Sequence, residues 1–381
     1  MVRIGFISTY NCQCGVATYT NYLGNALRDK GNEVMVFAEA LRGNQSLDES
    51  ASTLPYLRCW SREGNLKRLE KAIMRWKPDV VHVQYESALF EKRVQLLMLM
   101  NQLHRSGLPV VITFHDIISD KIFAELFSKA SCSIVHHEYM ARAAKSLGLK
   151  QGAVYTIIPH GSREVKYIDP IEAKKTLGIP VEKRVISVFG FVGKYKGHYT
   201  LLTLFSSLLE KEPNAFLLFA GGVHPLLPEN VENHMEVVKQ TIDANKDKMM
   251  MTGFILEKDL DTYIAASDVI TFPHIVFNAC SISGATHTVL GGGKPIVITA
   301  FPLYNDLTND VNCLRFPPTT DMYMLPEIFA KLFESPDLCK KLGYGAKKLA
   351  EETSWKNVAA MTMQVYDKVL NDGKVEVKKN E

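Results

Sequence analysis

Short apolar segments rich in Val and Ile alternate with amphipathic segments along the whole chain. Continuous apolar runs between helical patterns are typical of parallel strands that helices cover on both faces. The strands predicted in the first half are Arg3–Ser8, Glu33–Phe37, Val80–Val83, Val110–Phe114, Ser133–His137 and Tyr155–Pro159. Those predicted in the second half are Val185–Gly190, Phe216–Ala220, Met249–Phe254, Asp268–Phe272, Pro295–Thr299 and Cys313–Phe316. Two such series in tandem predict an α/β fold with two doubly wound, Rossmann-like domains.

The length of the chain, 381 residues, also suits two domains better than one compact core. The polar region Gly161–Pro180 fits a linker or its edge, and we place the domain boundary near Tyr167. The predicted domains are therefore residues 1–167 and 168–353, and the charged tail at residues 371–381 is expected to fray.

The composition excludes several classes of protein. A net charge of +3 leaves no broad basic surface for nucleic acid. No apolar run is long enough for a transmembrane helix. Met1–Thr9 lacks the layout of a signal peptide, and seven scattered cysteines suit reduced thiols, so a cytoplasmic protein is expected.

A segment of small residues, Ser281–Ala285, is predicted to open a helix after the irregular turn Pro273–Cys280. The glycines Gly291–Gly293 are expected to end this helix, because Pro295 stands where a Walker phosphate loop needs Ser or Thr. A helix whose first turn carries small side chains leaves its free backbone N–H groups reachable, and such a terminus is a natural seat for phosphate. The pattern therefore predicts a nucleotide or another phosphorylated ligand.

Several segments with chemically useful residues follow the predicted strands. They are Thr9–Ala17, His115–Asp116, His160–Gly161, Phe191–Gly197, Ile255 and Pro273–His274. Ligands of open α/β sheets bind beyond the carboxyl ends of the strands. We therefore expect the two domains to face a central cleft that these segments line.

Seven motifs occur in an order and spacing that are informative together, although each is weak alone. They are Cys14–Tyr19, Asp79–Glu86, Ile112–Asp116, Ile158–Gly161, Gly190–Gly197, Asn312–Asp321 and the stretch from Ser354 to about Leu370. Together they resemble a retaining glycosyltransferase of the GT-B fold, in family 4, and the resemblance extends over nearly the whole chain. The resemblance implies transfer of a sugar from a nucleoside-diphosphate donor to an acceptor without a metal ion. It also implies that the helix at 354–370 crosses back to complete the first domain.

The resemblance assigns roles to individual residues. Lys196 matches the lysine that contacts the donor diphosphate, and His115 matches the active-site histidine that contacts the donor sugar. The first domain would hold the acceptor near Gly15 and Val16, and the second would hold the donor. The implied donor-binding residues are Gly190, Gly193, Lys194, Lys196, Phe254, Ile255, Ser281, Ser283, Gly284, Ala285 and Thr288. Cationic side chains and backbone N–H groups can replace a metal ion at a departing diphosphate.

Two departures from the family pattern stand out. The arginine of the phosphate segment falls at Gly193, where the adjacent Lys194 is the available substitute. The two glutamates of the family's E-x7-E motif fall at Cys280 and Thr288. The sequence around Ser283 instead resembles an S-x-S-G branch that also lacks these acids.

The substrates are set by the resemblance alone. We expect transfer of a hexose, mannose first, to a glycan, lipid or protein-linked acceptor, with GDP-mannose as the first choice of donor and a UDP-sugar as the second. Two alternatives stay open. The missing glutamates and arginine motivate a GT-B protein that binds nucleotide sugar without transferring it, and the other alternative is a GT-B epimerase, which predicts more acidic residues in the cleft. A dehydrogenase is disfavoured because no G-x-G-x-x-G follows the first strand.

No metal site and no cofactor are predicted. Cys12 and Cys14 are too close for the usual zinc spacing, and the adjacent His136 and His137 would point to opposite faces of a strand. The apolar stretch Val94–Leu103 favours a helix packed on the first sheet, with a weak contact to a membrane surface as the alternative. A homodimer is also left open.

Overall fold

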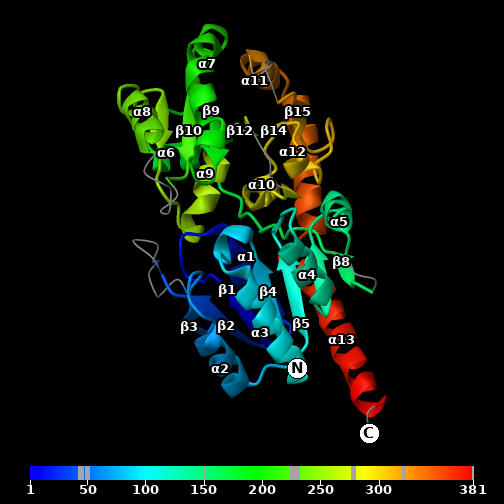
Figure 1. The fold of residues 1–381 in the computed structure, drawn as a ribbon. Helices are drawn as coiled ribbons and strands as arrows, with labels where there is room; N and C mark the ends of the chain where they lie inside the picture. The colour runs from blue at the N-terminus through cyan, green and yellow to red at the C-terminus, as the bar shows by residue number, and fades with distance from the viewer. Residues whose placement is uncertain are drawn as a thin grey trace. The chain divides into compact units, whose positions relative to one another are not determined.

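The computed structural model describes residues 1–41, 47, 52–149, 152–223, 232–275, 280–318 and 323–379. The chain divides into two compact units (Figure 1). The first unit holds Met1–Gly161, a short strand β13 (Cys280–Ser281) and the C-terminal helix α13 (Trp355–Lys379). The second unit holds the chain from Ser162 to Ser354 apart from that short segment.

The first unit is built on a parallel sheet of seven strands in the order β3-β2-β1-β4-β5-β7-β8. The strands are β1 (Arg3–Ser8), β2 (Glu33–Glu39), β3 (Tyr56–Trp60), β4 (Val80–Tyr85), β5 (Val110–Phe114), β7 (Cys132–Val135) and β8 (Tyr155–Ile157). The edge strand β3 was not predicted, because its polar Arg58 and half-exposed Leu57 break the apolar run that marks a buried strand. A separate antiparallel pair joins β6 (Asp116–Ile117) to β13.

Helices cover both faces of this sheet. Helix α1 (Gly15–Asp29) and the red helix α13 of Figure 1 pack on one face through Leu23 and Tyr366. The other face is covered by α2 (Lys67–Trp76), α3 (Arg93–Arg105), α4 (Lys121–Lys129) and α5 (Glu138–Lys145), and the 3-10 helix η2 (Ser87–Leu89) follows β4. The apolar stretch at 94–103 therefore packs mainly on the sheet, although Met98 stays 60% exposed.

The second unit has a parallel sheet of six strands in the order β11-β10-β9-β12-β14-β15. The strands are β9 (Arg184–Phe189), β10 (Ala215–Ala220), β11 (Met249–Met251), β12 (Val269–Phe272), β14 (Ile296–Thr299) and β15 (Leu314–Phe316). β11 ends three residues before the predicted Phe254 because Gly253 takes a positive φ of 73°. Both units are thus doubly wound α/β layers, as predicted.

Helices also cover both faces of the second sheet. One face carries α7 (His198–Lys211), α8 (Glu232–Asp243) and α11 (Leu325–Glu334). The other carries α6 (Pro170–Thr176), α9 (Leu260–Ala266) and α10 (Gly284–Val289), and α12 (Pro336–Glu352) contributes to both cores. Short 3-10 helices are η3 (Lys194–Lys196), η5 (Glu257–Asp259), η6 (Leu290–Gly292) and η7 (Pro302–Tyr304).

Two boundaries differ from the sequence predictions. The units part after Gly161 rather than near Tyr167, because the buried Arg163 side chain already binds Asp261 of the second unit at 2.6 Å. Helix α13 continues to Lys379 rather than ending near residue 370. None of the helices in the described part of the chain combines the length and apolar character needed to cross a bilayer.

Candidate functional site

The second sheet has a topological switch point between β9 and β12. From β9 the chain builds outward to β10 and β11, and it then returns to add β12, β14 and β15 on the other side. Ligands of doubly wound folds bind where the connections at the carboxyl ends of two such strands diverge. In this unit those ends carry Gly190 after β9 and Pro273 after β12.

Three of the predicted donor-binding residues come together at this switch point. Gly190 has a φ of 102°, and a Cβ built on it would lie 3.6 Å from Lys196 Nζ and 3.4 Å from Ala285 Cβ. A side chain at position 190 would therefore occupy the space between the lysine ammonium and the start of α10. The structure leaves this space to backbone, which suits the close approach of a ligand.

The ammonium of Lys196 is desolvated, and the described residues give it no carboxylate partner. The side chain is half-buried, and burial lowers the pKa of Lys196 to about 8. Among the described residues no carboxylate forms an ion pair with it. A partly buried charge without a partner is costly, and an anionic ligand relieves that cost. The site therefore has the electrostatic character of an anion site that is still charged at neutral pH.

The start of α10 differs from the predicted helix. Ser283 is the N-cap and accepts a hydrogen bond from the Thr286 N–H at 3.4 Å, so the helix begins at Gly284. Ser281 lies outside the helix and in the first unit, where it pairs with Asp116. Ser281 therefore belongs to the first unit, whereas Ser283, Gly284 and Ala285 belong to the second. The Thr288 hydroxyl donates to the Gly284 carbonyl at 3.1 Å, inside the helix.

The helical stretch ends as the glycines predict. α10 runs into η6, and Gly293 closes it with a φ of 62°. α10 itself has only 6 residues, so its dipole is small and the fixed charge at this edge of the sheet comes from Lys196. Gly193 has an extended backbone with open space around its Cα, and the side chain of Lys194 lies outside the described residues.

An aromatic pair lies beyond the ends of β9 and β11. The rings of Phe191 and Phe254 stack with centroids 6.2 Å apart and planes inclined by 29°. Phe254 is 38% exposed, whereas Ile255 packs against the core. The exposed ring of Phe254 is thus open to a planar ligand group, and Ile255 serves the core.

In the first unit, His115 lies after β5 but its ring is already engaged by the protein. Its Nε2 is 3.0 Å from Gln84 Oε1, and its Nδ1 is 3.4 Å from His136 Nε2. Burial holds the pKa of His115 well below its usual range, so the ring is neutral. Near the start of α1, Gly15 is exposed with open space where a Cβ would lie, and Val16 is buried.

Comparisons with known proteins agree with this fold. A family model described as Glycosyltransferase Family 4 matches residues 14–161, and one described as Glycosyl transferases group 1 matches residues 169–349. The chain belongs to glycosyltransferase family 4. It is 24% identical to phosphatidyl-myo-inositol mannosyltransferase of Mycolicibacterium smegmatis, over 99% of this chain and 96% of the relative.

Solved structures of other proteins share the GT-B fold of this glycosyltransferase. Sucrose-phosphate synthase from Thermosynechococcus elongatus superposes with a TM-score of 0.73 at 17% identity, over 98% of this chain and 100% of that one. Anabaena HepE in complex with UDP-glucose gives a TM-score of 0.73 at 16% identity, over 97% and 99%.

This glycosyltransferase lacks both glutamates of the family's E-x7-E motif, and the structure shows where the residues at those two positions lie. Cys280, at the first glutamate position, lies in β13 of the first unit and pairs with Ile117. Thr288, at the second position, lies in α10 of the second unit with its hydroxyl bonded inside the helix. Neither residue supplies a carboxylate. The predicted loop of the Asn312–Asp321 motif falls partly on residues 319–321, which lie outside the described residues.

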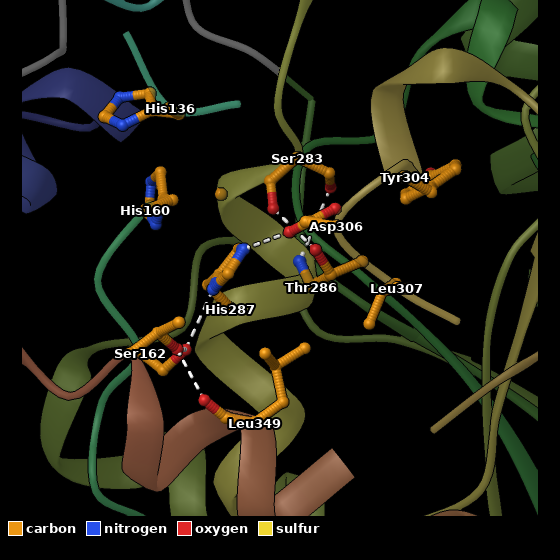
Figure 2. Close-up of polar contacts among 12 residues, drawn as sticks. His136, His160, Ser162, Ser283, Thr286, His287, Tyr304, Asp306, Leu307 and Leu349 are labelled. Atoms are coloured by element: carbon orange, nitrogen blue, oxygen red, sulfur yellow. Dashed lines mark hydrogen bonds and ion pairs between the residues drawn. The ribbon is translucent and has the colours of Figure 1, made fainter. Parts of the chain in front are cut away.

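Sequence reasoning missed a polar network on α10 that Figure 2 shows. His287 Nδ1 lies 2.8 Å from Ser162 Oγ, and its Nε2 lies 2.6 Å from Asp306 Oδ2. A hydrolytic triad has the opposite ring orientation, with Nε2 toward the serine. Ser162 is also only 1% exposed, and its Oγ lies 2.8 Å from Thr353 Oγ1. The network therefore joins α10 to the first and last segments of the second unit in the chain. Its serine is not arranged as a nucleophile.

Glu86 of the glycosyltransferase is a second residue that sequence reasoning did not select, although it ends the Asp79–Glu86 motif. Burial, with a smaller effect of the Asp116 charge, raises the pKa of Glu86 to about 7. Asp116 is itself held by the Ser87 N–H at 3.0 Å. A carboxyl group with a pKa near neutrality can exchange a proton with a bound hydroxyl group.

Within the described ranges, no group of three or more His, Cys, Asp or Glu side chains is placed to hold a metal ion. The histidines considered above have structural partners. His137 caps α5 by accepting the Tyr139 N–H at 3.2 Å, and His136 Nδ1 lies 3.0 Å from the Ile158 carbonyl.

Proposed function

We propose that the chain is a retaining hexosyltransferase that takes its sugar from a nucleoside-diphosphate donor bound to the second unit. The observation that carries the proposal is the half-buried ammonium of Lys196 beside Gly190 at the switch point, which has no ion-pair partner among the described residues. A diphosphate gains negative charge as the glycosidic bond to it breaks. A fixed cation in surroundings of low polarity stabilises that charge without reorganisation.

We propose mannose as the transferred hexose, with GDP-mannose as the first choice of donor and a UDP-sugar as the second. The mannosyltransferase from M. smegmatis supports mannose, as does a match to MMP alpha-(1->4)-mannosyltransferase of Mycolicibacterium hassiacum, 28% identical over 116 residues. The structure of HepE with UDP-glucose supports the second choice.

In the proposed reaction, Lys196 holds the diphosphate as a point charge, and the N–H groups at Ser283–Ala285 add donors at the phosphate. The acceptor, a glycan, lipid or protein-linked sugar, is assigned to the first unit near Gly15, where the space is open. No metal ion is required in this scheme because Lys196 supplies the positive charge. The anomeric configuration is retained through attack on the face that the diphosphate leaves.

A second candidate is a nucleotide-sugar-binding protein that does not transfer. Cys280 and Thr288 replace both family glutamates, and Gly193 replaces the arginine of the phosphate segment. This candidate shares the donor site and differs only in turnover.

Calorimetry with GDP-, UDP- and ADP-sugars, with EDTA and with magnesium, tests the donor. We expect micromolar to millimolar binding of one nucleotide class that is equal in both buffers. Consumption of that donor, alone as slow hydrolysis or with candidate acceptors, then separates the two candidates. Binding without consumption of any donor leaves the binding protein, and no binding of any nucleotide sugar contradicts both. Configuration at the anomeric carbon of the product, read by NMR, tests retention.

A further inference from the structure

His274 lies on the other side of the switch point from Gly190. It follows Pro273 at the carboxyl end of β12, and it is only 7% exposed. A histidine this deeply buried at a ligand-binding edge needs polar partners, since an unsatisfied ring nitrogen is costly. Its partners show what holds it there.

The ring and the backbone of His274 are both anchored. Nδ1 lies 2.6 Å from the hydroxyl of Tyr304, which is fully buried in η7. The backbone oxygen of His274 accepts a hydrogen bond from Thr299 Oγ1 at 2.8 Å. Both partners belong to β14 or to the segment that follows it, so the turn after β12 is fixed to the neighbouring strand of the sheet.

The same turn supports the loop that carries Lys196. The Ile275 N–H donates to the Tyr195 carbonyl at 3.0 Å, on one side of the lysine. On the other side, Gly197 approaches the turn so closely that a built Cβ would overlap the Pro273 oxygen. Lys196 therefore sits between two contacts that depend on the position of His274.

The protonation state of His274 is consistent with its support of the Lys196 loop. Burial, reinforced by the positive charge of Lys196, lowers the pKa of His274 to about 3. The imidazole is therefore neutral at physiological pH and does not compete with Lys196 for an anion. A protonated ring at the same place would repel the lysine and change where its ammonium lies.

We propose that His274 and Tyr304 are positioning residues, a neutral hydrogen-bonded pair that fixes the Lys196 loop for the diphosphate of the donor. This inference rests on the proposed function, because it gives the pair a purpose only if Lys196 binds that diphosphate. The pair acts through the loop that carries Lys196.

The test measures calorimetric dissociation constants of GDP and UDP for the full-length protein. We expect His274→Ala to weaken the better ligand about tenfold, the effect of losing one well-placed hydrogen bond. His274→Gln keeps a polar group for Tyr304 and should recover most of the affinity. Tyr304→Phe, which preserves the packing volume, should weaken binding in the same direction even if His274→Ala fails to fold.

A double-mutant cycle with Lys196→Met makes the test specific. If the pair works through the lysine, His274→Ala should have almost no further effect in the Lys196→Met background. Full additivity would overturn the inference. Normal affinity in both His274→Ala and Tyr304→Phe, with weak binding in Lys196→Met, would overturn the inference and leave the proposed function standing. Normal affinity in Lys196→Met would overturn both.

The first unit offers a matched control. His82 Nδ1 lies 2.6 Å from the Tyr366 hydroxyl, the ring is fully buried, and burial lowers the pKa of His82 to about 3. His82→Ala therefore removes the same chemical pair in the unit that does not contain Lys196. It should lower the melting temperature as His274→Ala does, but leave the affinities for GDP and UDP unchanged. An equal loss of affinity in His82→Ala would mean that general destabilisation explains the result for His274, and the inference would fall.

Discussion

The affinity for a nucleoside diphosphate should fall as the pH rises through about 8, because Lys196 loses its proton there. Burial lowers the pKa of this lysine, so its charge is present below that pH and is lost above it. An exposed lysine would stay charged to a pH of about 10. The unusual feature is therefore a loss of binding within a pH range that most proteins tolerate.

The size of the effect follows from the titration. If only the ammonium form binds, the dissociation constant is multiplied by 1 + 10^(pH − pKa), which is about 1.1 at pH 7 and about 11 at pH 9 for the pKa of about 8. The expected weakening is about tenfold, or about 1.4 kcal/mol. Lys196→Met should weaken binding at pH 7 by about 10- to 150-fold, the cost of losing a hydrogen bond to a charged group.

The assay is calorimetry with GDP and UDP between pH 6.5 and pH 9 at constant ionic strength. Lys196→Arg is the matched control, because a guanidinium stays charged throughout this range and any remaining pH dependence then belongs to the nucleotide. The wild-type profile, after subtraction of the Lys196→Arg profile, should bend near pH 8 and that of Lys196→Met should be flat. A Lys196→Met profile that bends like the wild type, or an affinity that rises with pH, would refute the reasoning.

Three further predictions concern stability. Gly197→Ala should cost about 2 kcal/mol or more, because Gly197 has a φ of 76° and a Cβ there would overlap the turn after β12; thermal unfolding measures this, with Gly193→Ala as the control in open space. His287→Ala should cost about 3 kcal/mol, because it leaves the Asp306 carboxylate without its 2.6 Å partner; urea unfolding measures this. Asp169→Ala should cost about 1 kcal/mol as the N-cap of α6 is lost, and Asp169→Asn should recover most of it.

Each of these has a contrary outcome. Equal melting temperatures for Gly197→Ala and Gly193→Ala would show that the close approach of the turn is not a constraint in solution. A His287→Ala variant as stable as the wild type would mean that water replaces the lost partner. An Asp169→Asn variant as unstable as Asp169→Ala would mean that charge, and not capping, is the contribution.

Most of the fold could be predicted from the sequence, because a strand buried on both faces must be a continuous apolar run. β1, β5 and β10 follow the predicted ranges closely. β3 was not predicted because an edge strand needs fewer apolar residues. β13 was not predicted because 2 residues are too few to show an alternating pattern. The loops after β9 and β12 could also be placed, since topology fixes where the carboxyl ends of neighbouring strands lie.

What the residues do at the site was decided by tertiary structure. The sequence shows that residue 196 is a lysine, but its low pKa results from burial in the folded protein. His115 is a conspicuous residue in the sequence, but its ring nitrogens face Gln84 of β4 and His136, which follows β7, and no local pattern shows these partners. The partnership of His274 with Tyr304 joins residues 30 positions apart. Local patterns report which side chains are buried, whereas the dielectric environment and the hydrogen-bond partner of each group depend on segments that only folding brings together.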